Sequence, residues 1–171
     1  MKKAKAVRRV IALILCAVFI SLPLCSCRGK SKNINWLLST APKNLDPQTA
    51  NDESELLIIK NCFTGLFEKN ADGELFSSYV ESYDISKSGD TYIFHLYKDK
   101  YWSIYEKGNT KKYAPVTAHD FEFAIRRVFS DDPNCDIMNV LLSIKGAKKA
   151  VEERDFSALG VSCPDDYTLK L

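Results

Sequence analysis

The first 26 residues differ from the rest of the chain and leave 145 residues for a folded domain. A short basic stretch with no acidic residue ends at Arg9, and Val10–Leu24 then runs for fifteen residues without a charge. This order is typical of a secretory signal. The apolar stretch is short for a membrane span, which needs about 20 apolar residues. The fold must therefore be built from the remaining residues, which are enough for one domain.

The residues after the apolar stretch resemble a bacterial lipobox. Leu24-Cys25-Ser26-Cys27 places an aliphatic and two small residues before a cysteine that would be acylated. Acyl chains would hold Cys27 on a membrane, because each buried methylene contributes about 0.8 kcal/mol. We expect a lipoprotein signal peptide at residues 1–26, a tether at residues 27–33 and an extracytoplasmic, lipid-anchored domain. An ordinary cleaved signal or a signal anchor is the alternative.

The charge of the remaining residues argues against a nucleic-acid partner. The whole chain carries +2, and residues 1–26 hold five basic residues and no acidic one, so residues 27–171 carry −3. A nucleic-acid binder normally has a basic folded part. A composition of 46% hydrophobic and 27% charged residues indicates a globular domain and argues against disorder.

Hydrophobic periodicity predicts a mixed α/β domain. Strands are expected at residues 35–39 and 167–171, and a β-hairpin at residues 79–86 and 91–97. Helices are expected at residues 53–67 and 144–154, with a third that begins at Thr117 and is stopped by Asp132-Pro133. Residues 107–113 read as a polar loop, and Asp72-Gly73 as a turn.

The Thr117-led helix has the clearest start signal. The Thr117 side chain can accept from free backbone amides, while Asp120 can reach back to the amide of the cap residue. Apolar residues at helical spacing then predict the face that is buried. They are Phe121, Ala124, Ile125 and Val128.

Motifs for catalysis, metal binding or cofactor binding are absent from the sequence. His95 reads as a cross-strand residue and His119 as a first-turn helix residue. No pair of histidines or cysteines has the spacing of metal ligands. Beyond the lipobox, the cysteines read as buried or partly buried thiols that could form at most one disulfide; they are Cys62, Cys135 and Cys163. We expect no enzyme, metal or cofactor; a secreted hydrolase that depends on His119 or Cys62 is an alternative.

Seven short motifs occur in one order along residues 36–171. They are Leu45-Asp46-Pro47, Thr64-Gly65-Leu66-Phe67, Tyr92-Ile93-Phe94-His95-Leu96 with Trp102-Ser103, Pro115-Val116-Thr117-Ala118-His119-Asp120-Phe121, Ile144-Lys145-Gly146-Ala147, Leu159-Gly160-Val161 and Asp166-Tyr167-Thr168-Leu169. In this order they resemble the extracellular solute-binding proteins of bacterial peptide and nickel ABC importers, family 5, the oligopeptide-binding type. The loop between Ser103 and Pro115 is longer than the family's turn.

The resemblance implies an incomplete periplasmic-binding-protein-like fold of type II. Residues 34–67 would be the first strand and helix of lobe I, and residues 68–171 a small β-rich subdomain that stops before the second lobe. Thr117 and Asp120 would be scaffold. Ligand contact would come from the loop after Leu45-Asp46-Pro47, at Asn51, Asp52, Glu53 and Ser54. A helix N-cap is the equally favoured alternative for these four residues.

The function that the resemblance implies is capture of oligopeptides outside the membrane and delivery to an ABC permease. The partners would be an oligopeptide, the permease and, through acylated Cys27, the lipid bilayer. Without a second lobe to close on the ligand, we expect little binding by this chain alone. A membrane-tethered remnant or interaction module that binds no solute is the alternative, and nickel complex, haem or sugar stay open as solutes.

Overall fold

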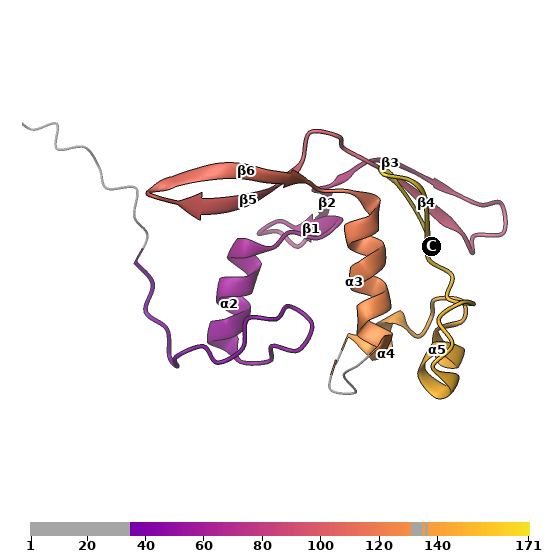
Figure 1. Ribbon diagram of the computed structural model, residues 1–171, viewed down its shortest axis with the longest axis horizontal. Helices are drawn as coiled ribbons and strands as arrows, with labels where there is room; N and C mark the ends of the chain where they lie inside the picture. Colours follow the sequence, from indigo (N-terminus) through magenta and orange to yellow (C-terminus); the bar gives the residue numbers. More distant parts are fainter. Residues whose placement is uncertain (1–34, 131–134, 136) are drawn as a thin grey trace, which may run out of the picture. The chain divides into compact units, whose positions relative to one another are not determined.

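The computed structural model describes residues 35–130, 135 and 137–171. The predicted signal peptide, the predicted tether with its acylation site at Cys27, residue 34 of the predicted lobe I and the predicted helix stop at Asp132-Pro133 lie outside these residues. Residues 38–171 form one compact unit, which is the subject of the following paragraphs (Figure 1). Among the described residues, no helix has the length and apolar character to cross a bilayer.

A four-stranded antiparallel sheet in the order β3-β4-β8-β7 is the centre of this unit. The strands are β3 (Val80–Ile85), β4 (Tyr92–Leu96), β7 (Ser162–Asp165) and β8 (Thr168–Lys170). The predicted hairpin is confirmed as β3–β4, with Gly89 at φ 75° in its turn. The predicted last strand is confirmed as β8, which lies between β4 and β7 and sets Leu169 opposite Phe94. Strand β7 was not predicted.

Three helices follow the sheet hairpin in the sequence, and the longest packs on the sheet. They are α3 (Ala118–Ser130), α4 (Met138–Leu141) and α5 (Ala147–Glu153). Figure 1 shows α3 and α5 on one side of the sheet, and α3 contacts β7, β8, α4 and α5. The core between them buries Ala118 and Phe129 of α3 and Leu169 of β8. Helix α5 is confirmed but shorter than expected, and α4 was not predicted.

The predicted buried face of α3 is correct except at one position. Val128 is buried, and Phe121 and Ile125 are half-buried against the core. Ala124 is exposed, so its assignment to the buried face was wrong. It lies at the margin of the face, where the Gln48 side chain donates to the Ala124 carbonyl oxygen at 2.7 Å.

Two further hairpins lie outside the central sheet. The first joins β1 (Phe67–Lys69) to β2 (Leu75–Ser77) and confirms the turn at Asp72-Gly73; the second joins β5 (Tyr101–Glu106) to β6 (Asn109–Pro115). The expected polar loop at residues 107–113 was wrong, because only Lys107 and Gly108, both at positive φ, form the turn. Most of β5 and β6 is exposed on both faces, so the sequence shows no apolar alternation there.

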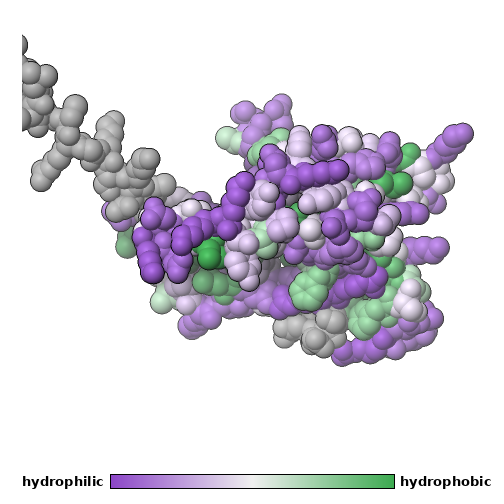
Figure 2. Space-filling view, turned by 45° about the horizontal axis from the view of Figure 1, so that its top comes forward, coloured by the Kyte–Doolittle hydropathy of each residue, from purple (hydrophilic) through white to green (hydrophobic). Residues whose placement is uncertain are grey.

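Hydrophilic side chains cover most of the surface in Figure 2.

The first helix of the unit is α2 (Glu53–Cys62), which ends before the expected residue 67. The Phe63 amide still donates to the Ile59 carbonyl at 2.8 Å, but Phe63 itself is extended and the chain then enters β1. The prediction of a strand at residues 35–39 was wrong, since these residues pair with none of the described strands.

The three described cysteines are free thiols that differ in exposure. Cys135 is buried and Cys163 partly buried, as expected. Cys62 is exposed, so the expectation of a buried thiol was wrong there. It lies in the last turn of α2, beyond the buried Ile59, where the helix face is open to solvent.

Candidate functional site

The four predicted ligand-contact residues lie where a loop enters α2. The Asp52 carboxylate caps the helix, accepting from the Ser54 amide at 2.8 Å and from the Thr40 hydroxyl at 2.9 Å. Ser54 is 3% exposed, and its hydroxyl lies 3.1 Å from that of Ser39. The N-cap alternative is therefore confirmed for Asp52, and Ser54 belongs to the same network. Asn51 and Glu53 stay exposed.

Glu55 fixes the preceding loop from the first turn of α2. Its Oε1 accepts from the backbone amides of Lys43 and Asn44 at 2.8 and 2.7 Å. These two hydrogen bonds hold the pKa of Glu55 below its usual range. Because two amides share one charged acceptor, the loop has a defined path over the helix N-terminus.

An ion pair ties the Leu45-Asp46-Pro47 motif to α3. Arg127 donates to both carboxylate oxygens of Asp46, with Nη1 at 2.9 Å from Oδ1, and also to Gln48 Oε1 at 3.1 Å. The hydrogen bond from Arg127 and that from the Gln48 amide lower the pKa of Asp46 to about 2. Two segments about 80 residues apart in sequence are thus joined beside the candidate ligand-contact loop. Sequence reasoning missed Gln48, Glu55 and Arg127 as residues that position this loop.

We expect the Asp46–Arg127 pair to make stability depend on acid pH. Because folding lowers the pKa of Asp46 from 3.8 to about 2, its contribution is fully present above about pH 4 and is lost as pH falls through about 2. The side chains of Arg127 and Asp46 are 43% and 27% exposed, so screening reduces this contribution to about 1 kcal/mol. Urea unfolding between about pH 2 and pH 5 should show a flatter profile for Asp46→Asn than for the unchanged chain.

The control is Asp72→Asn, in the exposed β1–β2 turn. Its profile should parallel that of the unchanged chain. Parallel profiles for both variants would show that the Asp46 carboxylate is not what couples this unit to acid.

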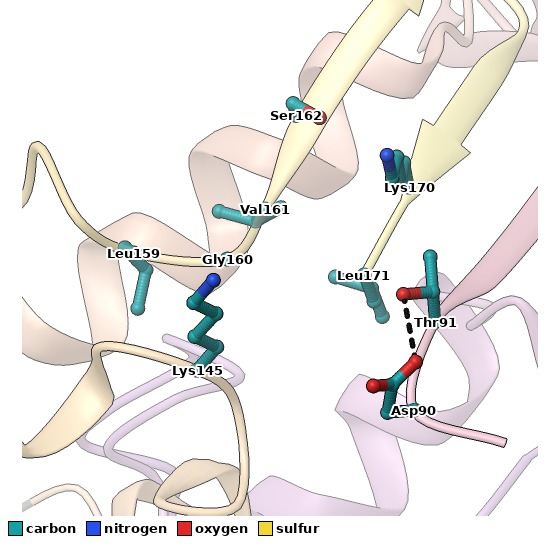
Figure 3. Close-up of a pocket in the computed structure, with 9 residues that line it drawn as sticks. All are labelled: Asp90, Thr91, Lys145, Leu159, Gly160, Val161, Ser162, Lys170 and Leu171. Carbon is teal, nitrogen blue, oxygen red and sulfur yellow. Dashed lines mark hydrogen bonds between the residues drawn. The ribbon is translucent and has the colours of Figure 1, made fainter. Parts of the chain in front are cut away.

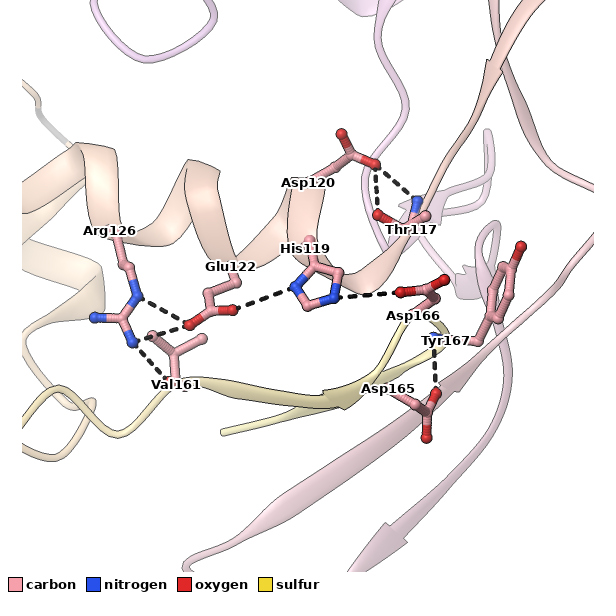
Figure 4. Close-up of polar contacts among 9 residues, drawn as sticks. All are labelled: Thr117, His119, Asp120, Glu122, Arg126, Val161, Asp165, Asp166 and Tyr167. Atoms are coloured by element: carbon pink, nitrogen blue, oxygen red, sulfur yellow. Dashed lines mark hydrogen bonds and ion pairs between the residues drawn. The ribbon is translucent and has the colours of Figure 1, made fainter.

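The predicted cap of α3 is confirmed for Asp120. Its Oδ2 accepts from the Thr117 amide at 2.7 Å (Figure 4). The Thr117 hydroxyl donates to the same oxygen at 3.1 Å, whereas we had expected it to accept from a backbone amide. These two hydrogen bonds lie at the first turn of α3.

The two histidines lie where the sequence placed them, each beside carboxylates. His95 Nε2 is 3.1 Å from Asp84 Oδ2 across the β3–β4 hairpin. His119 lies in the first turn of α3, with Nδ1 3.7 Å from Glu122 Oε2 and Nε2 3.4 Å from Asp166 Oδ1 (Figure 4). Both side chains are partly exposed, at 41% for His95 and 55% for His119.

Cys163 of β7 joins His119 and Glu122 in a cluster that the sequence did not reveal. One ligand atom from each residue lies within 4.8 Å of the other two. Burial and the hydrogen bond with Glu122 raise the pKa of Cys163 to about 12. A catalytic thiol needs a lowered pKa, so this environment does not favour a nucleophilic cysteine.

A pocket of about 280 Å³ lies elsewhere, between the β3–β4 turn and the ends of β7 and β8 (Figure 3). Asp90 and Thr91 line one side of it, and Lys145 and Lys170 approach from the others. None of the residues predicted to contact ligand lines this pocket. Its lining combines apolar residues with the charged side chains of Asp90, Lys145 and Lys170.

The mixed α/β fold matches that of substrate-binding proteins. Haemophilus influenzae OppA, solved in complex with the peptide RPPGFSPFR, has a TM-score of 0.62 and 30% identity, over 75% of this chain and 24% of that one. Listeria monocytogenes OppA, solved bound to peptide, has a TM-score of 0.62 and 25% identity, over 74% and 24%. The fold class predicted from the sequence is thus confirmed for a part of such a protein.

Sequence comparison finds proteins of the same class. The oligopeptide-binding protein AliB of Streptococcus pneumoniae is 29% identical over 174 aligned residues, which cover 99% of this chain and 26% of AliB. The oligopeptide-binding protein OppA of Bacillus subtilis is 34% identical over 145 residues, or 84% of this chain and 25% of OppA. No protein-family model matches the sequence.

The chain is a homologue of the oligopeptide-binding proteins of solute-binding family 5, as the seven motifs predicted. It spans about a quarter of the length of the curated relatives it matches.

Proposed function

We propose that this chain is the N-terminal portion of the substrate-binding component of an ABC importer, which captures oligopeptides and delivers them to a membrane permease. The observation that carries the proposal is the match of almost the whole chain to proteins named for oligopeptide binding. The likeness to OppA structures that contain peptide supports it. The proposed role is binding and not catalysis.

In this proposal, residues 34–67 begin lobe I, and residues 68–171 form its small subdomain. Residues 1–26 are a lipoprotein signal peptide, and acylated Cys27 anchors the protein outside the cytoplasm through a tether at residues 27–33. The charge pattern and the lipobox support these assignments.

Ligand contact from this part of the protein comes from the loop at Asn51–Ser54. The capping bonds of Asp52 and the burial of Ser54 hold the loop in place, and Asn51 and Glu53 offer exposed polar side chains beside it. An extended peptide takes affinity from backbone hydrogen bonds and selectivity from side-chain pockets. Most of the ligand-binding surface of the whole protein would belong to the second lobe.

Calorimetry with a mixed oligopeptide pool tests the proposal in two steps. The 171-residue chain should give no measurable binding heat, because one part of one lobe has no closed state for the ligand to favour. If the coding frame continues downstream, the extended protein should bind the pool. In it, Glu53→Ala should weaken binding about tenfold through loss of a polar contact, and Lys60→Ala, exposed on the same helix, should not.

The possible failures have different meanings. A micromolar isotherm from the 171-residue chain would overturn the claim that closure of two lobes is required. If the extended protein gives no binding heat with the peptide pool, the oligopeptide assignment is overturned. An immediate stop codon would favour the alternative of a tethered remnant that binds no solute.

A further inference from the structure

The fold brings three different metal-ligating groups together on one side of α3. His119 and Glu122 are three residues apart on the helix and so lie on the same face. Cys163 reaches this face from β7, a strand that packs against α3. One ligand atom from each of the three residues lies within 4.8 Å of the others, and His119 Nδ1 is 3.7 Å from Glu122 Oε2.

These distances between ligand atoms are close to the distances between the ligand atoms around a bound metal ion. Metal–ligand distances of about 2.0 to 2.3 Å set the ligand atoms of a tetrahedral zinc ion roughly 3.3 to 3.6 Å apart. The largest separation in the cluster, up to 4.8 Å, therefore needs to contract by up to about 1.5 Å, and rotation of partly exposed side chains can supply this. Imidazole nitrogen, thiolate sulfur and carboxylate oxygen are the three donor types that proteins offer to zinc.

We propose that His119, Glu122 and Cys163 form a binding site for a divalent metal ion of the zinc class. The site is independent of the proposed transport function. Three protein ligands leave a fourth position for water. Coordination replaces the S–H bond of Cys163 by a sulfur–metal bond, and the proton leaves to solvent. The ion would join α3 to β7.

The surroundings of His119 supply the second observation that supports a metal site. Ligating histidines almost always donate their other ring N–H to a carboxylate or carbonyl, which fixes the tautomer. His119 Nε2 lies 3.4 Å from Asp166 Oδ1, so a proton held there leaves the Nδ1 lone pair directed at Glu122 (Figure 4). The His95 ring has one such carboxylate neighbour, Asp84, but no cysteine beside it in any grouping of described metal-ligating residues.

Arg126 lies beside the site and holds the opposite oxygen of Glu122. Its Nε and Nη2 lie 3.0 and 2.9 Å from Glu122 Oε1, while Oε2 is the oxygen that faces His119. The guanidinium is fixed by further bonds to the carbonyls of Phe156 and Val161, so it orients the carboxylate. With a thiolate at Cys163, the charges of Glu122, Asp166 and the thiolate balance those of Arg126 and a divalent ion.

Cobalt(II) titration of the full chain tests the site, since a thiolate–cobalt bond gives a near-ultraviolet charge-transfer band. The background should carry serine at Cys16, Cys25 and Cys27, so that these N-terminal thiols cannot contribute. We expect one equivalent of cobalt to produce the band, and zinc to displace it. Cys163→Ser should abolish the band, and His119→Gln should weaken cobalt binding at least about tenfold.

The chain offers matched controls for both ligand types. Cys62→Ser removes an exposed thiol, and His95→Gln removes the other carboxylate-paired histidine; both should leave the titration unchanged. Circular dichroism of the metal-free variants checks folding, and the exposed position of His119 keeps His119→Gln informative if Cys163→Ser unfolds.

The site is overturned if no band forms, if the band persists in folded Cys163→Ser, or if Cys62→Ser removes it. Nitrogen-15 labelling of the imidazoles adds an independent readout of the unchanged chain. Zinc should shift the Nδ1 resonance of His119 much more than that of His95, and equal shifts would show adventitious binding only.

Discussion

Alanine at Gly146 is expected to cost the fold about 3 kcal/mol or more. Gly146 precedes α5 with φ 77°, a conformation that costs a non-glycine residue about 1 to 2 kcal/mol. A Cβ there would also overlap the carbonyl oxygen of Ala158 and lie 2.6 Å from its carbonyl carbon. These are backbone atoms, so no side-chain rotation relieves the overlap.

Neighbouring hydrogen bonds prevent the backbone from moving away easily. The Gly160 amide donates to the Lys145 carbonyl at 2.7 Å, which holds the two crossing segments together. A shift of the segment around Ala158 would break this bond and disturb the buried Leu159. Urea unfolding of the full chain, followed by circular dichroism, would measure the loss.

Gly89→Ala is the matched control for this prediction. Gly89 has nearly the same φ, 75°, but no atom lies within 4 Å of an added Cβ. Its substitution should therefore cost only the conformational part, about 1 to 2 kcal/mol. Equal losses at the two positions would show that the close approach at Ala158 does not contribute.

The backbone contact beside Gly146 is of a kind that cannot be predicted from the sequence. The segments Ile144–Ala147 and Leu159–Val161 were each recognised as motifs, but their contact was not. The contact is between backbones, and no side-chain pattern encodes it. By contrast, the β3–β4 hairpin and α3 were predicted well, because alternation, turn residues and a cap are local signals.

Elements without a one-sided apolar pattern were missed for a related reason. Strands β5 and β6 are exposed on both faces, and β7 is a short strand that contains Pro164. The strand expected at residues 35–39 is apolar enough, but a strand forms only beside a partner. Pairing is a property of the fold and not of the segment.

In the candidate site, too, contacts between residues close in sequence could be predicted, whereas contacts between distant segments could not. Asp52 and Asp120 were identified as possible caps because a cap and its helix are adjacent in sequence. The Asp46–Arg127 pair joins distant segments, and so does the approach of Cys163 to His119. Residue types alone could suggest these partners but could not select them.

Leu169→Ala is expected to destabilise the chain by about 2 to 5 kcal/mol, the usual cost of removing a buried leucine side chain. Leu169 is fully buried and lies in β8, with β4 on one side and β7 on the other. It is opposite Phe94 in register, and helix α3 contacts the same strand. A cavity here would weaken the packing of the sheet and α3 together.

Leu75→Ala is the control, because Leu75 lies in the outer β1–β2 hairpin and is 64% exposed. It should change the free energy of unfolding by less than about 0.5 kcal/mol. Equal effects of the two substitutions would place the core elsewhere. A large loss at Leu169 in a single cooperative transition would instead show that β8, an inner strand of the sheet, belongs to the same cooperative unit as α3, which packs on it.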